Sequence, residues 1–171
     1  MLRIVSFLPS ATEMVCALGL VDQLVGVSHE CDYPPEVKEK PVVVRSVLPI
    51  ETMTEREIDD AVTQRLHNGQ TLYEVSENLL RELEPDLIIT QDLCQVCAPS
   101  GNELSHALRV LPKRPEILWM TPKSLIGIED NMRALGEVTG HQRQADDFIR
   151  LYPGPSHPPA DCPPQVCLSL R

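Results

Sequence analysis

Short apolar runs rich in β-branched residues alternate along this chain with segments of helical periodicity, and this alternation constrains the fold more than any other feature. The runs cover residues 2–8, 24–28, 42–44, 87–91 and 117–121. Each is short enough to be a buried strand. Strands that alternate with helices and are joined by short loops predict an α/β domain with an open, mostly parallel sheet flanked by helices.

Four capping-box sequences mark the expected helix starts. In such a box a hydroxyl side chain accepts a hydrogen bond from an amide of the first turn, and a carboxylate three residues later accepts one from the amide of the cap residue. The four pairs are Ser10 and Glu13, Thr54 and Glu57, Thr71 and Glu74, and Ser100 and Glu103. Apolar residues at helical spacing follow each pair, so we expect a helix after each.

A long amphipathic helix is predicted after the last strand, from Ser124 to about Thr139, with a further helix beginning at residue 141. Residues 153–171 contain six prolines and almost no periodicity, so they are predicted to be disordered. The expected division is a first lobe at 1–122, the long helix at 123–140, the start of a second lobe at 141–152 and the tail at 153–171.

Composition excludes several classes of function. The chain has 171 residues and a net charge of −10, and no cluster of Lys and Arg offers a surface for nucleic-acid phosphates. No run approaches the roughly 18 apolar residues of a membrane span. The N-terminus also lacks the basic region and long apolar core of a signal peptide, so we expect a cytoplasmic protein with no nucleic-acid partner and no membrane span.

The candidate site residues lie in the loops that leave the predicted strands. Ligands of open parallel sheets bind at the carboxyl ends of the strands. The residues at these ends are Pro9 and Ser10 after the first strand, His29, Glu30, Cys31, Asp32 and Tyr33 after the second, and Gln91, Asp92, Cys94 and Cys97 at the end of the fourth. A solvated turn would account for Asp32 but not for His, Cys and Tyr together, so we predict that these loops bind a ligand.

Cys94 and Cys97 form a C-x-x-C pair that favours a second interpretation. Two thiolates can hold one metal ion, and Cys31 with His29 from a neighbouring strand end would complete a tetrahedral set of three sulfurs and one nitrogen. The same pair could instead serve redox chemistry. No nucleophile elbow, P-loop or G-x-G-x-x-G motif is present, so outside this thiol cluster we expect a protein that is not an enzyme.

The stretches RIVSFLPSATEMVCALGL, LVGVSHECDYPPEV and PDLIITQDLCQVCA together resemble the cobalamin-type branch of the class III, helical-backbone substrate-binding proteins. These are relatives of the periplasmic binding components of cobalamin and ferric-siderophore ABC transporters. The resemblance covers about residues 1–151. It implies two α/β lobes bridged by one long helix, with the ligand in the cleft between the lobes. The sequence departs from this pattern after residue 151, where the rest of the second lobe is missing; the aperiodic tail favours truncation, and a genuine short form is the alternative.

The resemblance further implies that the chain binds cobalamin or a related corrinoid, with no required cofactor and with an ABC transporter permease as a partner. Tyr33 would stack on a planar ligand, while His29 or Asp32 would bond amide side arms of the kind a corrin carries. The sequence leaves open whether the ligand is cobalamin, another corrinoid, haem or a siderophore. A third interpretation is a protein–protein module that uses the long helix at 124–139.

Overall fold

The computed structural model describes residues 1–92, 106–109 and 111–152. The chain divides into two compact units, Met1–Met120 and Thr121–Arg171. The first unit holds every described strand, and the second holds two helices. The four-part division at residues 122, 140 and 152 stays a prediction.

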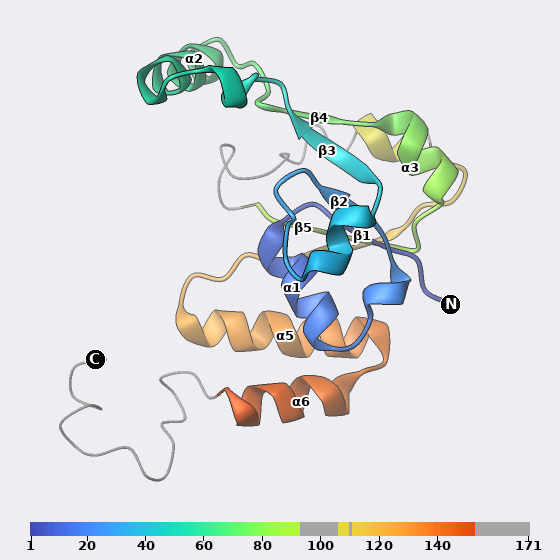
Figure 1. Cartoon of the computed structure of the whole chain (residues 1–171). Coiled ribbons are helices and arrows are strands. Elements are labelled where there is room, and N and C mark those ends of the chain that lie inside the picture. The colour runs from blue at the N-terminus through green and yellow to red at the C-terminus, as the bar shows by residue number, and fades with distance from the viewer. Residues whose placement is uncertain (93–105, 110, 153–171) are drawn as a thin grey trace, which may run out of the picture. The chain divides into compact units, whose positions relative to one another are not determined.

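A six-stranded sheet forms the centre of the first unit (Figure 1). Its strands are β1 (Ile4–Ser6), β2 (Leu24–Ser28), β3 (Val42–Ser46), β4 (Tyr73–Val75), β5 (Leu87–Thr90) and β6 (Glu116–Trp119). The strand order is β4-β3-β2-β1-β5-β6. Every neighbouring pair is parallel except β3 with β4, which is antiparallel. The predicted fold class, an open and mostly parallel sheet with flanking helices, is confirmed, and all five predicted strands are present.

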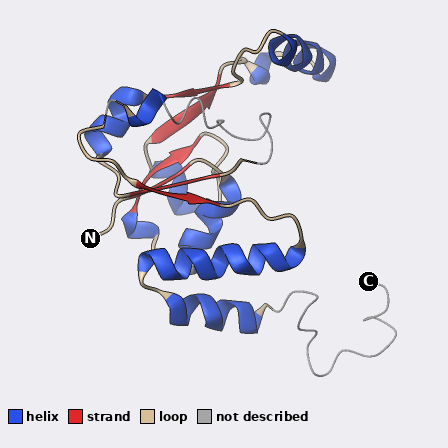
Figure 2. Ribbon diagram, turned by 180° about the vertical axis from the view of Figure 1, so that it is seen from behind, coloured by secondary structure: helices blue, strands red, loops and turns tan. Residues whose placement is uncertain are grey.

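The helices of the first unit connect these strands (Figure 2). They are α1 (Pro9–Ala17), α2 (Glu55–His67) and α3 (Glu77–Leu83), with 3-10 turns η1 (Val21–Gln23), η2 (Pro35–Glu39) and η3 (Ile50–Thr52). Helix α1 packs on β1 and β2, and α3 packs on β3. In contrast, α2 buries none of its residues. Of these helices, α1 therefore contacts the two strands, β1 and β2, whose carboxyl ends carry predicted site loops.

The core of the first unit lies along the two central strands, β1 and β5. All residues of both strands are buried, and Ile4, Val5, Ile88 and Ile89 have no exposed surface. A parallel strand covered on both faces has no solvent side, so its sequence is a continuous apolar run rather than an alternating one. This explains why these strands could be recognised from the sequence.

The predicted helix starts have mixed outcomes. The box of Thr54 and Glu57 is confirmed, because the Thr54 amide donates to Glu57 Oε2 at 2.8 Å and the Glu57 amide donates to Thr54 Oγ1 at 3.4 Å. The box of Ser10 and Glu13 is wrong: α1 begins at Pro9 after Leu8, and no side chain caps it. Proline is already suited to the first helical position, which moves the start ahead of Ser10. The predicted start at 100–103 lies outside the described residues.

The box of Thr71 and Glu74 is also wrong, since this stretch forms the edge strand β4. Thr71 Oγ1 accepts from the amide of Tyr73 at 3.1 Å and donates to the carbonyl of the same residue at 2.7 Å. The helix starts later, where Ser76 Oγ accepts from the amide of Leu79 at 3.4 Å. Pairing with β3 satisfies the backbone of Tyr73–Val75 and overrides a local capping signal.

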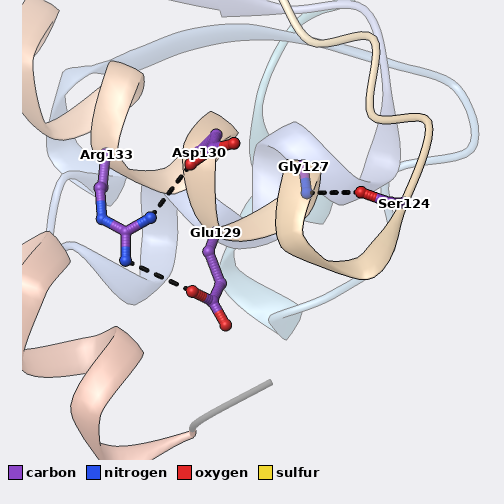
Figure 3. Close-up of polar contacts among 5 residues, drawn as sticks. All are labelled: Ser124, Gly127, Glu129, Asp130 and Arg133. Atoms are coloured by element: carbon purple, nitrogen blue, oxygen red, sulfur yellow. Dashed lines mark hydrogen bonds and ion pairs between the residues drawn. The ribbon is translucent and has the colours of Figure 1, made fainter. Parts of the chain in front are cut away.

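The second unit contains α5 (Leu125–Thr139) and α6 (Gln142–Leu151), close to both predicted helices. Ser124 Oγ caps α5 by accepting from the Gly127 amide at 3.2 Å, and Figure 3 shows this contact beside Arg133, which pairs with Glu129 and Asp130. None of the helices in the described part of the chain combines the length and the apolar character that a bilayer crossing requires.

Gly26 in β2 is a packing point at which we expect substitution to destabilise the first unit. A Cβ atom here would lie 2.9 Å from Val43 Cγ1 and 3.0 Å from Leu83 Cδ1. Overpacking of this kind costs about 1–3 kcal/mol, so Gly26→Val should lower the free energy of unfolding by that amount in urea titrations. Ala17→Val, on the exposed end of α1, is the control and should change it by less than about 0.5 kcal/mol. Equal effects of the two variants would contradict the close approach of α3 to the sheet.

Asp86 lies just before β5 and bonds to Arg3, just before β1, and to Lys113, which precedes β6. These bonds should make the stability of the fold depend on pH. Asp86 accepts from Lys113 Nζ at 2.7 Å and from the Arg3 amide at 3.0 Å, and these bonds hold the pKa of the Asp86 carboxyl below its ordinary value. A lowered folded pKa gives stability that is present above the unfolded value of about 3.9 and is lost as pH falls. The difference in unfolding free energy between wild type and Asp86→Asn should be constant above about pH 5 and shrink below about pH 4. The exposed Asp59→Asn is the control, and a difference that stays constant down to pH 2 would contradict this role.

Candidate ligand-binding site

The parallel pairing of the central strands brings three of the predicted loops to one edge of the sheet. Strand β1 pairs in parallel with β2 on one side and with β5 on the other. The chain leaves β1 toward β2 but returns to the far side of β1 as β5, so the strand order reverses here. In open α/β sheets ligands bind at such a reversal, outside the carboxyl ends of the strands.

The loops after β1 and β5 flank this reversal directly. Pro9 and Ser10 form the first turn of α1, with Pro9 half-buried and Ser10 exposed. Gln91 is half-buried and Asp92 exposed after the end of β5. The structure thus places these four predicted residues on one edge. The remaining two predicted residues of this loop, Cys94 and Cys97, lie outside the described residues.

The loop after β2 turns its side chains alternately inward and outward. Glu30, Asp32 and Tyr33 are exposed, and Tyr33 retains 64% of its accessible surface. His29 is held toward the sheet, since its amide donates to the carbonyl of Val44 at 3.0 Å. Of the five predicted residues in this loop, three therefore face solvent.

One imidazole nitrogen of His29 has a hydrogen-bond partner among the described residues, and the other has none. Its Nδ1 lies 3.4 Å from Ser28 Oγ, and its ring centroid lies 6.2 Å from that of Tyr73. Its Nε2 is buried and has no hydrogen-bond partner among the described residues. His29 thus packs against the β4 edge instead of projecting beside Tyr33.

Cys31 is enclosed below the exposed loop. Its side chain is 6% exposed, its Sγ lies 3.1 Å from Thr12 Oγ1, and its amide donates to the carbonyl of Ser28 at 3.0 Å. Burial raises the pKa of the Cys31 thiol above its ordinary value, and the charges of Glu30 and Asp32 act in the same direction against the lowering effect of the hydrogen bonds. The thiol is therefore neutral at pH 7, whereas metal ligation and nucleophilic attack need the thiolate.

The described residues do not bring together the predicted metal ligands. Across residues 1–92, 106–109 and 111–152, no group of three or more His, Cys, Asp or Glu side chains is placed to hold a metal ion. Because two of the four proposed ligands, Cys94 and Cys97, lie outside these ranges, the set of His29, Cys31, Cys94 and Cys97 stays a prediction. The burial of Cys31 counts against its part in that set.

Tyr73 is a residue of this region that the sequence interpretation missed. A cavity of about 530 Å³ runs beside β4 and is lined by Tyr73 and Val75, with Val47, Glu77 and His106 around them. None of the predicted site residues lines it in the described part of the chain. The capping sequence predicts a helix start around Tyr73, but the apolar, polar, apolar order of Tyr73, Glu74 and Val75 is a signal that could have placed it on a strand.

Curated relatives carry one name. The vitamin B12-binding protein of Vibrio cholerae is 30% identical over 150 residues, which make up 85% of this chain and 42% of that protein. The vitamin B12-binding protein of Pectobacterium carotovorum is 51% identical over 144 residues, 84% of this chain and 40% of that protein. The chain therefore spans about two fifths of the length of the curated relatives it matches. No protein-family model matches it.

Solved structures show the same fold. A periplasmic vitamin B12-binding protein of Vibrio cholerae superposes with a TM-score of 0.56 at 30% identity, over 86% of this chain and 47% of that one. A periplasmic heme-binding protein from Pseudomonas aeruginosa superposes with a TM-score of 0.62 at 20% identity, over 88% of this chain and 42% of that one. The resemblance noted from the sequence is confirmed, and the chain is a relative of the class III periplasmic substrate-binding proteins of the vitamin B12-binding type.

Proposed function

We propose that this chain binds a corrinoid of the cobalamin type at the carboxyl edge of its parallel sheet, as part of a substrate-binding protein that serves an ABC transporter. The observation that carries the proposal is the gathering of exposed residues after β1, β2 and β5 on one edge, in a chain whose curated relatives are named for vitamin B12. The corrinoid is cargo and not a cofactor, and the protein performs no reaction on it.

The exposed side chains suit the two kinds of surface that a corrinoid presents. Its macrocycle is flat, and the 64% exposed ring of Tyr33 offers an aromatic face for stacking. Its rim carries amide side arms, whose N–H groups can donate to the carboxylates of Glu30 and Asp32 or to the amide oxygen of Gln91. Pro9 and Ser10 complete this edge beside β1.

The first unit supplies one wall of the cleft that the resemblance implies. Ligand sites that bury most of a small molecule gain affinity from contacts on both of its faces. A corrinoid resting on this edge would contact the first unit through one face.

Partner and location follow from the relatives and belong to the proposal. The V. cholerae and P. aeruginosa structures are described as periplasmic, so we place the protein in that compartment in preference to the cytoplasm expected from its N-terminus. Delivery of a corrinoid would then require a permease of the ABC type. The relatives offer no support for the alternative of a thiol-ligated metal or redox protein, and we do not propose it.

Tyr33 provides the test of the binding edge. Titration with cyanocobalamin, followed by the change in corrin absorption and by equilibrium dialysis, should show saturable binding to the wild type. Tyr33→Ala should raise Kd about tenfold, because loss of a stacking aromatic costs on the order of 1 kcal/mol or more. Tyr152→Ala removes a comparably exposed ring, 69% against 64%, from the end of α6 and is the matched control.

Two outcomes would argue against the proposal. If Tyr33→Ala and Tyr152→Ala change Kd equally, the ring at the sheet edge does not contact the ligand. If the wild type shows no saturable change with cyanocobalamin and emission spectroscopy instead finds stoichiometric zinc or iron, the thiol-metal interpretation replaces corrinoid binding.

A further inference from the structure

Two buried side chains meet beneath the exposed loop that follows β2. Thr12 in α1 has no exposed surface, and its Oγ1 lies 3.1 Å from Cys31 Sγ. The two residues are 19 positions apart in the chain, so their contact joins the first helix to a loop with no regular structure. A hydrogen bond between two buried groups that water cannot replace is expensive to remove.

The loop has few other attachments. Among the described residues, the bond with Thr12 is the one hydrogen bond made by any side chain of positions 30–34. The loop is attached at its start by the His29 amide on Val44, and the chain is next buried at Val37 in η2. Between these points Glu30, Asp32 and Tyr33 are exposed, and the loop is attached through the Cys31 side chain and through the bond of the Cys31 amide to the Ser28 carbonyl.

Cys31 is consequently in the wrong place to touch a ligand, although its neighbours are exposed. A 6% exposed thiol offers almost no surface to a molecule resting on the sheet edge. Cys31 instead lies between two elements. One is α1, which starts at the carboxyl end of β1, and the other is the loop that starts at the carboxyl end of β2.

We propose that Cys31 is a positioning residue, whose buried contact with Thr12 holds the loop of residues 29–33 so that Tyr33 and the adjacent carboxylates face the ligand edge. The inference rests on the proposed function for what the edge binds, but the holding of the loop is a separate property. In this inference Cys31 does not contact the ligand, as the sequence predicts, but holds the residues that do. Glu30, Asp32 and Tyr33 remain as the contacts of this loop.

Amide hydrogen exchange tests the holding directly. The amide at position 31 is bonded to the Ser28 carbonyl, and the amide of His29 is bonded to Val44 in the sheet. Thr12→Val, which keeps the shape of Thr12 but loses its hydroxyl, should speed exchange at position 31 about five- to tenfold, the factor expected for loss of one buried hydrogen bond. Exchange at His29 should stay unchanged.

A series at position 31 separates the bond from the bulk of the side chain. Cys31→Ala removes the partner of Thr12 and should match Thr12→Val, while Cys31→Ser keeps a hydrogen-bonding group and should restore most of the protection. Cys16→Ala is the matched control, because Cys16 lies one turn after Thr12 in α1, is half-buried and has no described hydrogen bond through its thiol. Thermal unfolding of each variant identifies any that fails to fold.

Affinity for cyanocobalamin shows whether the held loop serves binding. Thr12→Val and Cys31→Ala should raise Kd several-fold, and Cys31→Ser should fall between them and wild type. Unchanged exchange at position 31 in both Thr12→Val and Cys31→Ala would overturn the positioning role. Faster exchange with unchanged Kd, in a protein whose Kd responds to Tyr33→Ala, would overturn its link to the ligand. If the wild type does not bind cyanocobalamin, the proposed function fails, while exchange by itself still decides whether Cys31 holds the loop.

Discussion

The parallel pairing of β1 between β2 and β5 is the constraint on which the rest of the first unit depends. The three-residue β1 is buried on both faces and bonded on both edges, and the pairing continues past its end, where the Phe7 amide donates to Ile89 at 2.9 Å. Because parallel strands end on the same side, this single arrangement collects the loops after β1, β2 and β5. The exposed residues of the candidate site lie on one edge of the sheet for that reason, although Ser10 and Asp92 are far apart in the chain.

The strands could be predicted from the sequence where burial on both faces makes the strand a continuous apolar run. Val42–Ser46 and Leu87–Thr90 lie against neighbours on both edges and are largely apolar, so short apolar runs between turn signals identified them. Strand β4 was not predicted, because it is three residues long, forms an edge of the sheet and overlaps a capping sequence. Its identity is decided by pairing with β3, a contact about 30 residues away in the chain that no local pattern contains.

The candidate site shows a similar limit at the level of side chains. The position of each loop relative to the sheet followed from the order of strands and helices. The direction of each side chain did not, since an irregular loop has no period that separates an inner from an outer face. His29 and Cys31 looked as reactive as Tyr33 in the sequence, but the His29 ring lies beside the Tyr73 ring and the Cys31 thiol contacts the buried Thr12. Burial of the thiol then raises its pKa, so packing removes the reactivity that the residue type implied.

The side chains left exposed on the loop also bear on which ligand the edge prefers. Glu30 and Asp32 place two carboxylates beside Tyr33, and no described Lys or Arg pairs with either of them. A ligand with its own carboxylates, such as haem with its propionates, would meet like charges here, and that repulsion is costly when water is excluded. The amide arms of a corrinoid carry no charge and can donate hydrogen bonds to the same carboxylates. For the binding proposed above, the exposed carboxylates of Glu30 and Asp32 match the uncharged amide arms of a corrinoid better than they match the carboxylates of haem.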